Sequence, residues 1–281
     1  MTDQAPVCPG KWKKLLVCTD GSPESRDTVR VALDLGRRCD ARVVVFQALD
    51  INPEFEAVAP ELMPRVEEEI RAWLEAMKAE AAARGMSIDT RWRRRIPAYA
   101  AIIEEAAEME ADLILMGRHG RSGLARLLLG SVTGRVIGHS PINVLVVPKE
   151  VSPTFAKVLV ANDGSPYGNA AWEEALSLAR WSPGALYGIC VAREEGDIPE
   201  ADAILKKMLA AGNEHGVPIT AVMPQGQAPD DAIIQAAQKY GVDLIILGSH
   251  GRSGISRLLM GSVTERVIGS APCPVLVVVK R

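Results

Sequence analysis

Two stretches of this chain are near copies of each other: GRHGRSGLARLLLGSVTGRVIGHSPINVLVV at 117–147 and GSHGRSGISRLLMGSVTERVIGSAPCPVLVV at 248–278. They align without gaps, and 22 of the 31 positions carry the same residue. A long repeat of this quality indicates a duplicated unit, because unrelated segments do not share so many positions in register. The repeat therefore predicts the organisation of the whole chain.

The similarity extends upstream in weaker form. An apolar run ends in Asp-Gly-Ser at 15–22 and again at 158–165, so the order of the parts is duplicated as well. A period of roughly 140 residues is the size of a domain and too long for a solenoid repeat. We expect two tandem domains, residues 1–152 and 153–281, with a linker at 149–154 where Pro148 and Pro153 discourage continuation of either element.

Within each unit, short runs rich in β-branched residues alternate with longer stretches of helical period. The clearest helix covers 61–84. Five strands that alternate with helices predict an α/β fold, in which each of two doubly wound domains has a parallel sheet with helices on both faces. The predicted strands are 14–19, 42–48, 86–94, 112–117 and 143–147, followed by 157–161, 185–191, 218–223, 243–248 and 274–279.

The composition indicates a globular protein without a strong overall field. The 281 residues are 48% hydrophobic and carry a net charge of -3, so any anion site must be local. The first residues lack a signal-peptide core, and nowhere do 18 apolar residues run together, so we expect a cytoplasmic protein without membrane contact. The five cysteines contain no C-x-x-C pair, and we expect reduced thiols. They are Cys8, Cys18, Cys39, Cys190 and Cys273.

Each repeat holds a glycine-rich loop after its fourth predicted strand. Extra glycines at Gly123 and Gly254 leave the backbone free to adopt positive φ and to approach a ligand closely. The pattern becomes helical after the loop, so the first-turn amides of that helix are expected to be unpaired donors, which suits phosphate. Ordinary helix capping is the alternative, supported in the second repeat by an S-x-x-E box at Ser262 and Glu265. The loop residues are Gly117, Gly120, Gly130 and Ser131, and Gly248, Gly251, Gly261 and Ser262.

Charged side chains stand beside these loops. Asp20 and Asp163 follow the first strands, at the edge where doubly wound sheets bind ligands. They could accept from ribose hydroxyls or hold a phosphate-bound Mg²⁺, or simply form a turn or a helix cap. Loop arginines could add charge-assisted bonds to a triphosphate or remain solvated. These are Arg118, Arg121, Arg126, Arg252 and Arg257.

Several catalytic signatures are missing from the sequence, including the Walker loop, the Rossmann G-x-G-x-x-G, the G-x-S-x-G elbow and H-E-x-x-H. The loop histidines, His119 and His250, indicate packing or hydrogen bonding more than a general base. The basic run 91–95 contains a tryptophan, but as a strand it would alternate faces. We expect at least one of its arginines to pair inward with an acid such as Glu105, and nucleic-acid binding is not favoured.

The order and spacing of these features resemble the universal stress protein family in its tandem form, because G-x-x-G, nine residues, G-S is that family's ATP-binding motif. The resemblance covers nearly everything after the first dozen residues. It implies sheets of order 3-2-1-4-5 and ATP at the tips of the first and fourth strands. It also implies dimerisation through the last strands, so 144–147 and 275–278 are expected to pair as a pseudo-dimer within the chain. A further homodimer and an unidentified protein partner stay open.

By position, Asp20 and Asp163 match the aspartate near the adenosine, and Ala48 and Val191 match the apolar residue that contacts adenine, Ala48 being a smaller side chain. The implied function is a regulatory stress-response protein that binds ATP, with or without Mg²⁺. The alternatives are a slow ATPase or phosphotransferase using Asp20 and Asp163, and a partner-binding scaffold. The expected ATP contacts are Asp20, Ala48, Met116, Gly117, Gly120, Arg121, Gly130, Ser131 and Val132, then Asp163, Val191, Leu247, Gly248, Gly251, Arg252, Gly261, Ser262 and Val263.

Overall fold

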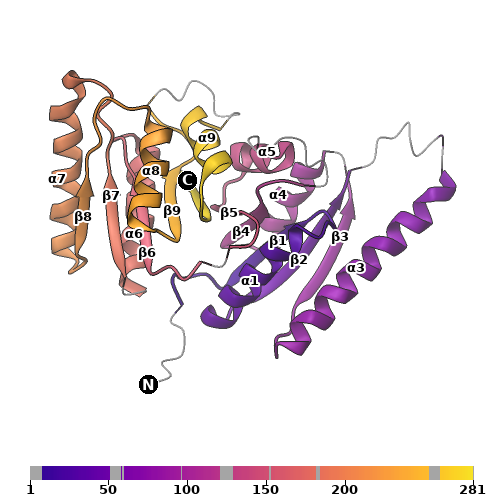
Figure 1. The fold of residues 1–281 in the computed structure, drawn as a ribbon. Coiled ribbons are helices and arrows are strands. Elements are labelled where there is room, and N and C mark those ends of the chain that lie inside the picture. Colours follow the sequence, from indigo (N-terminus) through magenta and orange to yellow (C-terminus); the bar gives the residue numbers. More distant parts are fainter. Residues whose placement is uncertain are drawn as a thin grey trace.

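A computed structural model describes residues 8–50, 58, 60–95, 97–120, 129–151, 153–181, 184–252 and 260–280. Its strands form one ten-stranded sheet of order β3-β2-β1-β4-β5-β10-β9-β6-β7-β8 (Figure 1). Each half contributes five strands in the order 3-2-1-4-5, which confirms the predicted doubly wound architecture. All pairings within a half are parallel.

The elements follow the repeat. In the first half they are β1 (Lys14–Thr19), α1 (Ser25–Cys39), β2 (Arg42–Leu49), η1 (Pro60–Leu62), α3 (Met63–Ala83), β3 (Asp89–Arg94), α4 (Ala98–Glu108), β4 (Leu113–Gly117), α5 (Ser131–His139) and β5 (Val144–Val147). In the second half they are β6 (Lys157–Ala161), α6 (Pro166–Trp181), β7 (Ala185–Ile189), η2 (Glu195–Asp197), α7 (Ile198–Glu214), β8 (Ile219–Val222), α8 (Pro229–Tyr240), β9 (Leu244–Gly248), α9 (Ser262–Ser270) and β10 (Val275–Val278).

The last strands of the two halves join the sheet. β5 and β10 pair antiparallel, with Leu145 opposite Leu276, so the pairing expected for the last strands is present. Both strands are fully buried. Because the pair is antiparallel, an approximate two-fold relation places each half's glycine loop near the last helix of the other half.

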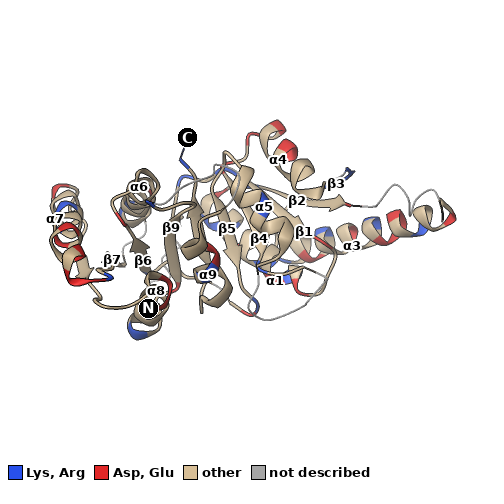
Figure 2. Cartoon of the chain, turned by 90° about the horizontal axis from the view of Figure 1, so that it is seen from above, with Lys and Arg blue, Asp and Glu red and all other residues tan. Residues whose placement is uncertain are grey.

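Helices cover both faces of the sheet, and the strand side chains alternate between them. Leu15 and Val17 pack in the core beneath α1, α3, α6 and α7, whereas Leu16 and Cys18 pack beneath α4, α5, α8 and α9. This alternation explains why strands as apolar as Leu113–Gly117 are buried on both sides. α3 and α7 lie at the two ends of the molecule, and acidic and basic residues intermingle along α3 (Figure 2).

The basic run at 91–95 belongs to the edge strand β3. Arg91 donates from Nη1 to Glu105 Oε1 at 2.6 Å, and Arg93 lies 2.8 Å from the other oxygen of the same fully buried carboxylate. The predicted inward pairing is therefore confirmed. The alternation of a strand places these two arginines on one face, where they neutralise Glu105, and Trp92 on the other.

The expectation of reduced thiols is wrong for two of the five cysteines. Cys8 and Cys39 form a disulfide, whereas the other three are free and buried. The residues before β1 run past the end of α1, where the Lys13 ammonium also donates to the carbonyl of Cys39 at 2.7 Å. The two cysteines are 31 positions apart without any local motif, so only the fold brings them together.

Candidate functional site

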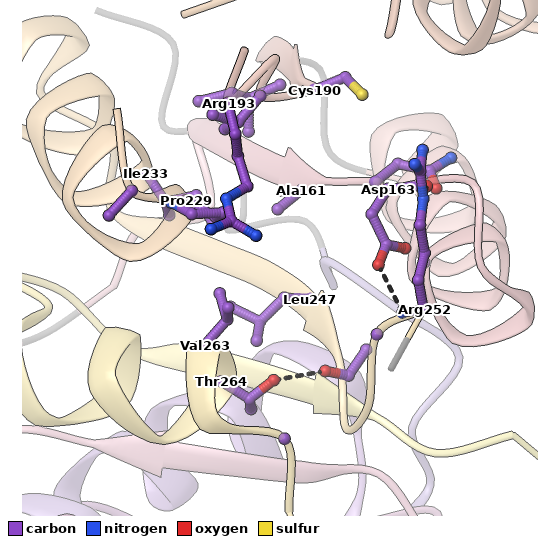
Figure 3. A pocket seen from close by; sticks show the side chains of 18 of the residues that line it. Ala161, Asp163, Cys190, Arg193, Pro229, Ile233, Leu247, Arg252, Val263 and Thr264 are labelled. Carbon is purple, nitrogen blue, oxygen red and sulfur yellow. Dashed lines mark hydrogen bonds between the residues drawn. The ribbon is translucent and has the colours of Figure 1, made fainter. Parts of the chain in front are cut away.

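The carboxyl ends of β6 and β9 border a cavity of about 690 Å³ in the second half (Figure 3). This volume lies in the range of small-molecule sites. All nine residues that the sequence proposes for the second half line this cavity, from Asp163 and Val191 to the loop glycines and the start of α9. The nine residues therefore lie around one cavity, at the edge of the sheet where the sequence placed them.

Asp163 holds the loop that follows β9. Its Oδ1 accepts the backbone N–H of Ser165 at 3.0 Å. Its Oδ2 accepts that of Arg252, also at 3.0 Å (Figure 3). In the first half Asp20 Oδ1 accepts the N–H of Ser22, also at 3.0 Å. The aspartate at the end of the first strand thus fixes the turn after its own strand, and in the second half it also pins the glycine loop.

The middle glycine of each loop is required by this aspartate. A Cβ at Gly251 would lie 2.8 Å from Asp163 Oδ2, and one at Gly120 would lie 2.9 Å from Asp20 Oδ2. The close approach expected at these glycines is therefore made to a carboxylate of the protein. The structure describes all six motif glycines, and none of them has φ above zero. Gly123 and Gly254, where the freedom to adopt positive φ is expected, lie outside the described residues.

The helix after each loop begins with uncapped amides. Gly261 is the N-cap of α9, and no side chain of the described residues caps it, so the predicted capping box of Ser262 and Glu265 is wrong. Ser262 is the first helical residue, one position too late to act as the cap. The N–H of Glu265 makes the first intrahelical bond, to the carbonyl of Gly261, which leaves the N–H groups of residues 262–264 without helical partners.

The same start is found in α5, where Gly130 is the N-cap without a side-chain cap. Each helix is tied to the preceding strand by a threonine. Thr133 Oγ1 donates to the carbonyl of Gly117 at 3.0 Å, and Thr264 Oγ1 donates to the carbonyl of Gly248 at 2.8 Å. These bonds orient the first-turn amides toward the loop in both halves.

The far end of the second-half cavity is apolar. Val191, Leu247, Ile233 and Pro229 line it, and Arg193 extends into it from above (Figure 3). In the first half, the corresponding Ala48, Met116 and Val132 belong to one apolar cluster. Arg193 was not among the predicted residues, because a lone exposed arginine after a strand carries no sequence signal.

The arginines do not all serve the loops. Arg252 Nε donates to the carbonyl of Asp163 at 2.5 Å, and its Nη1 lies 2.8 Å from Glu200 Oε2. Arg118 leaves its own half and donates to the carbonyls of Gly269 and Ala271, so its predicted contact with a triphosphate is wrong. The remaining candidates, Arg121, Arg126 and Arg257, lie outside the described residues.

Two other polar groups line the cavity. His250 packs its ring 4.9 Å from that of Tyr167 and lies 3.0 Å from Ser249 Oγ, which agrees with the packing and hydrogen-bonding interpretation. Burial raises the pKa of the Cys190 thiol to about 11, so this cysteine is protonated at neutral pH. A protonated thiol is a weak nucleophile, so Cys190 is not an activated nucleophile in this cavity.

Asn162 shapes the turn next to Asp163. It is buried, its Oδ1 accepts the N–H of Gly164 at 2.8 Å, and a Cβ at Gly168 would lie 2.6 Å from the same oxygen. The first half uses Thr19 and Ser25 at these positions, with their hydroxyl oxygens 2.7 Å apart. From the sequence, only an alignment of the two halves of the chain could have identified these two positions.

Among the described residues, no helix is long and apolar enough to cross a membrane. The same part of the chain contains no group of three or more His, Cys, Asp or Glu side chains arranged to hold a metal ion.

The fold and the loops define a class: a pair of doubly wound α/β domains with a ligand-sized cavity at the carboxyl ends of the strands. The chain belongs to the universal stress protein family, whose model matches residues 11–148 and again 154–279. The two matches confirm the tandem organisation expected from the repeat.

Relatives match one half or the whole chain. A universal stress protein of Methanocaldococcus jannaschii is 36% identical over 143 residues, covering 49% of this chain and 83% of its own length. One from Mycolicibacterium smegmatis is 28% identical and covers 94% of this chain and 96% of itself. The crystal structure of a universal stress protein from Archaeoglobus fulgidus superimposes with a TM-score of 0.70 at 25% identity, covering 94% and 97%.

Proposed function

We propose that the protein binds ATP in both halves and acts as a nucleotide-dependent regulator. The observation that carries this proposal is the pair of uncapped helix starts at Ser131 and Ser262. In the second half, residues 262–264 line the cavity with amides that have no helical partner. Free first-turn donors and the positive end of the helix dipole are a ready site for the phosphates of a nucleotide.

The other end of the cavity suits a purine base. Ile189 accepts the N–H of Asn162, and Ala192 donates to Pro224, so alternate residues of this segment face opposite neighbours. By the same alternation we infer that the N–H and C=O of Val191, which lines the cavity past the end of β6, are directed into it. A neighbouring donor and acceptor match the 6-amino group and N1 of adenine, and the apolar walls match its faces.

The environment of Asp163 supports binding more than catalysis. Each carboxylate oxygen accepts one backbone N–H group, so the carboxylate is fixed in one orientation as a structural acceptor. We therefore assign this aspartate to holding the loop, and the remaining lone pair on each oxygen can accept a ribose hydroxyl in the complex. We also propose that the pairing of β5 with β10 corresponds to the dimer contact of single-domain relatives.

The test uses proline as a means of removing one backbone donor. Ser262 is the first helical residue and Gly261 before it has φ -63° and ψ 140°, both of which proline tolerates. Ser262→Pro removes the side chain and the N–H, whereas the matched Ser262→Ala removes only the side chain. The difference between the two variants therefore reports on the backbone donor.

Calorimetric titration of the nucleotide-free protein with ATP, with and without Mg²⁺, is expected to give two equivalents per chain. Ser262→Pro is expected to bind one equivalent about tenfold to a hundredfold more weakly than Ser262→Ala, because a charge-assisted hydrogen bond is lost. Ser131→Pro and Ser131→Ala form the matched pair for the first half. Thermal melting of each variant checks that the fold is retained.

Two outcomes would count against the proposal. If acid extracts of the purified protein contain no nucleotide and ATP gives no heat, ATP binding is wrong. If ATP binds but the proline and alanine variants have equal affinity, the phosphates lie elsewhere. Titration with GTP and ADP separates recognition of the base from recognition of the phosphates.

A further inference from the structure

The two halves of the interface around β5 and β10 are not equivalent. Arg118, directly after β4, reaches across to the end of α9. Its Nη1 donates to the carbonyl of Gly269 at 3.1 Å and its Nη2 to that of Ala271 at 2.5 Å. A guanidinium group thus closes the carboxyl end of a helix in the other half, where unpaired carbonyls and the negative end of the dipole favour a cation.

The equivalent place on the other side lacks this arginine. In the repeat, Ser249 aligns with Arg118, and Gly138 and Ser140 align with Gly269 and Ala271, whose carbonyls accept from Arg118. A cavity of about 650 Å³ lies between Ser249 and the end of α5, lined by both aligned residues. We call it the Ser249 cavity. Gly269 is buried beneath the arginine, whereas Gly138 is partly exposed.

The walls of the Ser249 cavity favour a flat cation. Tyr167 and His250 line it with rings whose centroids are 4.9 Å apart, and guanidinium groups stack well on aromatic faces. None of the described lining residues is acidic, and Lys280 is the one lysine or arginine among them. The Lys280 side chain is exposed, so its charge is screened by water.

We propose that the Ser249 cavity binds a guanidinium group, carried by a small guanidino compound or by an arginine side chain of a partner peptide. The group occupies the position that Arg118 fills in the other half and donates to the carbonyls of Gly138 and Ser140. A planar guanidinium presents N–H groups from two nitrogens in a fixed fork that matches two carbonyls, whereas an ammonium group donates from a single nitrogen. This site does not depend on nucleotide binding.

The direct test is titration of the full-length protein with agmatine and L-arginine, followed by calorimetry and by NMR of the Ser249 region. Binding is expected with a dissociation constant of about 1 mM or below, and cadaverine and L-lysine are expected to bind at least about tenfold more weakly. An N-acetylated arginine amide distinguishes the sources, because it presents the side chain as a peptide does.

A substitution at Ser249 can place a guanidinium group of the protein itself in the Ser249 cavity. Ser249→Arg is expected to copy the Arg118 contact, to raise the thermal midpoint by about 2–4 °C and to abolish agmatine binding. Ser249→Met fills the cavity without donors, so it is expected to block binding without this gain. If agmatine binds Ser249→Arg as well as the unchanged protein, the proposal is wrong.

The reverse substitution calibrates the assay. Arg118→Ser reproduces the second arrangement in the first half, so it is expected to lower the thermal midpoint, to recover part of it in agmatine and to bind a second equivalent. If agmatine rescues Arg118→Ser while the unchanged protein binds no guanidino compound, the Ser249 cavity is not a guanidinium site. If Arg118→Ser does not fold, the Ser249→Arg comparison still decides.

Discussion

In both halves, a Cβ on the middle glycine of the loop would lie less than 3 Å from the aspartate that follows β1 or β6, whereas the side chains around the two loops differ. Asp50, after β2, accepts the N–H of Ala98 at 3.2 Å and so holds the start of α4. At the aligned position in the second half, Arg193 instead extends into the cavity. The two halves have therefore kept the same contacts within the loop, whereas the side chains that flank the site have diverged.

This contrast indicates which features are constrained by backbone geometry. Three features occur in both halves: the close approach of the middle glycine to the aspartate, the glycine N-cap of the following helix, and the threonine that bonds this helix to the strand before the loop. They position main-chain groups, so few side chains can replace them. The side chain of Arg118, in contrast, contacts the other half, and the aligned Ser249 lines a cavity that the other half also lines, and there the two copies have diverged.

The largest expected difference between the halves concerns covalent linkage. Only the first half contains a disulfide, Cys8 to Cys39, since the other three cysteines are free. Replacing both residues by serine is expected to cost about 3 kcal/mol, because the unfolded chain is no longer constrained. Urea unfolding with and without reductant, read by hydrogen exchange in each half, measures it. Equal midpoints under both conditions would contradict the cross-link, and Cys190→Ser serves as a control outside it.

A second difference concerns the glycine that ends the fourth strand of each half. A Cβ at Gly248 would lie 2.7 Å from the backbone carbon of Tyr167, whereas one at Gly117 would come no closer than 3.4 Å to any neighbour. Gly248→Ala is therefore expected to cost about 2 kcal/mol, because the start of α6 must move. Gly117→Ala is expected to cost less than about 0.5 kcal/mol. Equal losses of unfolding free energy in chemical denaturation would mean that the close approach of Gly248 to Tyr167 adds no cost.

Most of the fold could be predicted from the sequence because its signals are local. The repeat, the β-branched runs and the helical period predicted the strands to within three residues at each end. The candidate site was predictable for the same reason. Asp163 and Gly251 stand at the ends of apolar strands, and parallel strands bring those ends together.

Other contacts could not be read from local patterns. The destination of Arg118 depends on how the halves are placed, and the partner of Cys8 depends on where the first residues run. The S-x-x-E pattern at Ser262 failed for a different reason, since the helix begins at the serine itself and Gly261 takes the cap position. A one-residue shift in the helix start changes the role of the serine.

The smallest expected difference concerns the arginine in the middle of the last helix. Arg135 of α5 lies over the ring of Tyr99, 5.7 Å from its centroid, whereas Arg266 of α9 donates to Asp230 at 2.6 Å. The hydrogen bond from Arg266 holds the pKa of the Asp230 carboxyl below its usual range. A depressed folded-state pKa stabilises the protein above the unfolded value, and the contribution is lost as the pH falls through the folded pKa.

Asp230→Asn is therefore expected to cost less than about 1 kcal/mol at pH 7, since Arg266 is half exposed, and the cost is expected to shrink as the pH falls below about 4. Tyr99→Leu is expected to cost about 0.5 kcal/mol without a decrease near pH 4, because a cation over a ring involves no carboxylate. Unfolding free energies of both variants between pH 7 and pH 3 separate the two contacts. A pH-independent cost for Asp230→Asn would mean that the carboxylate acts at the start of α8 through its shape, with Arg266 contributing nothing to stability.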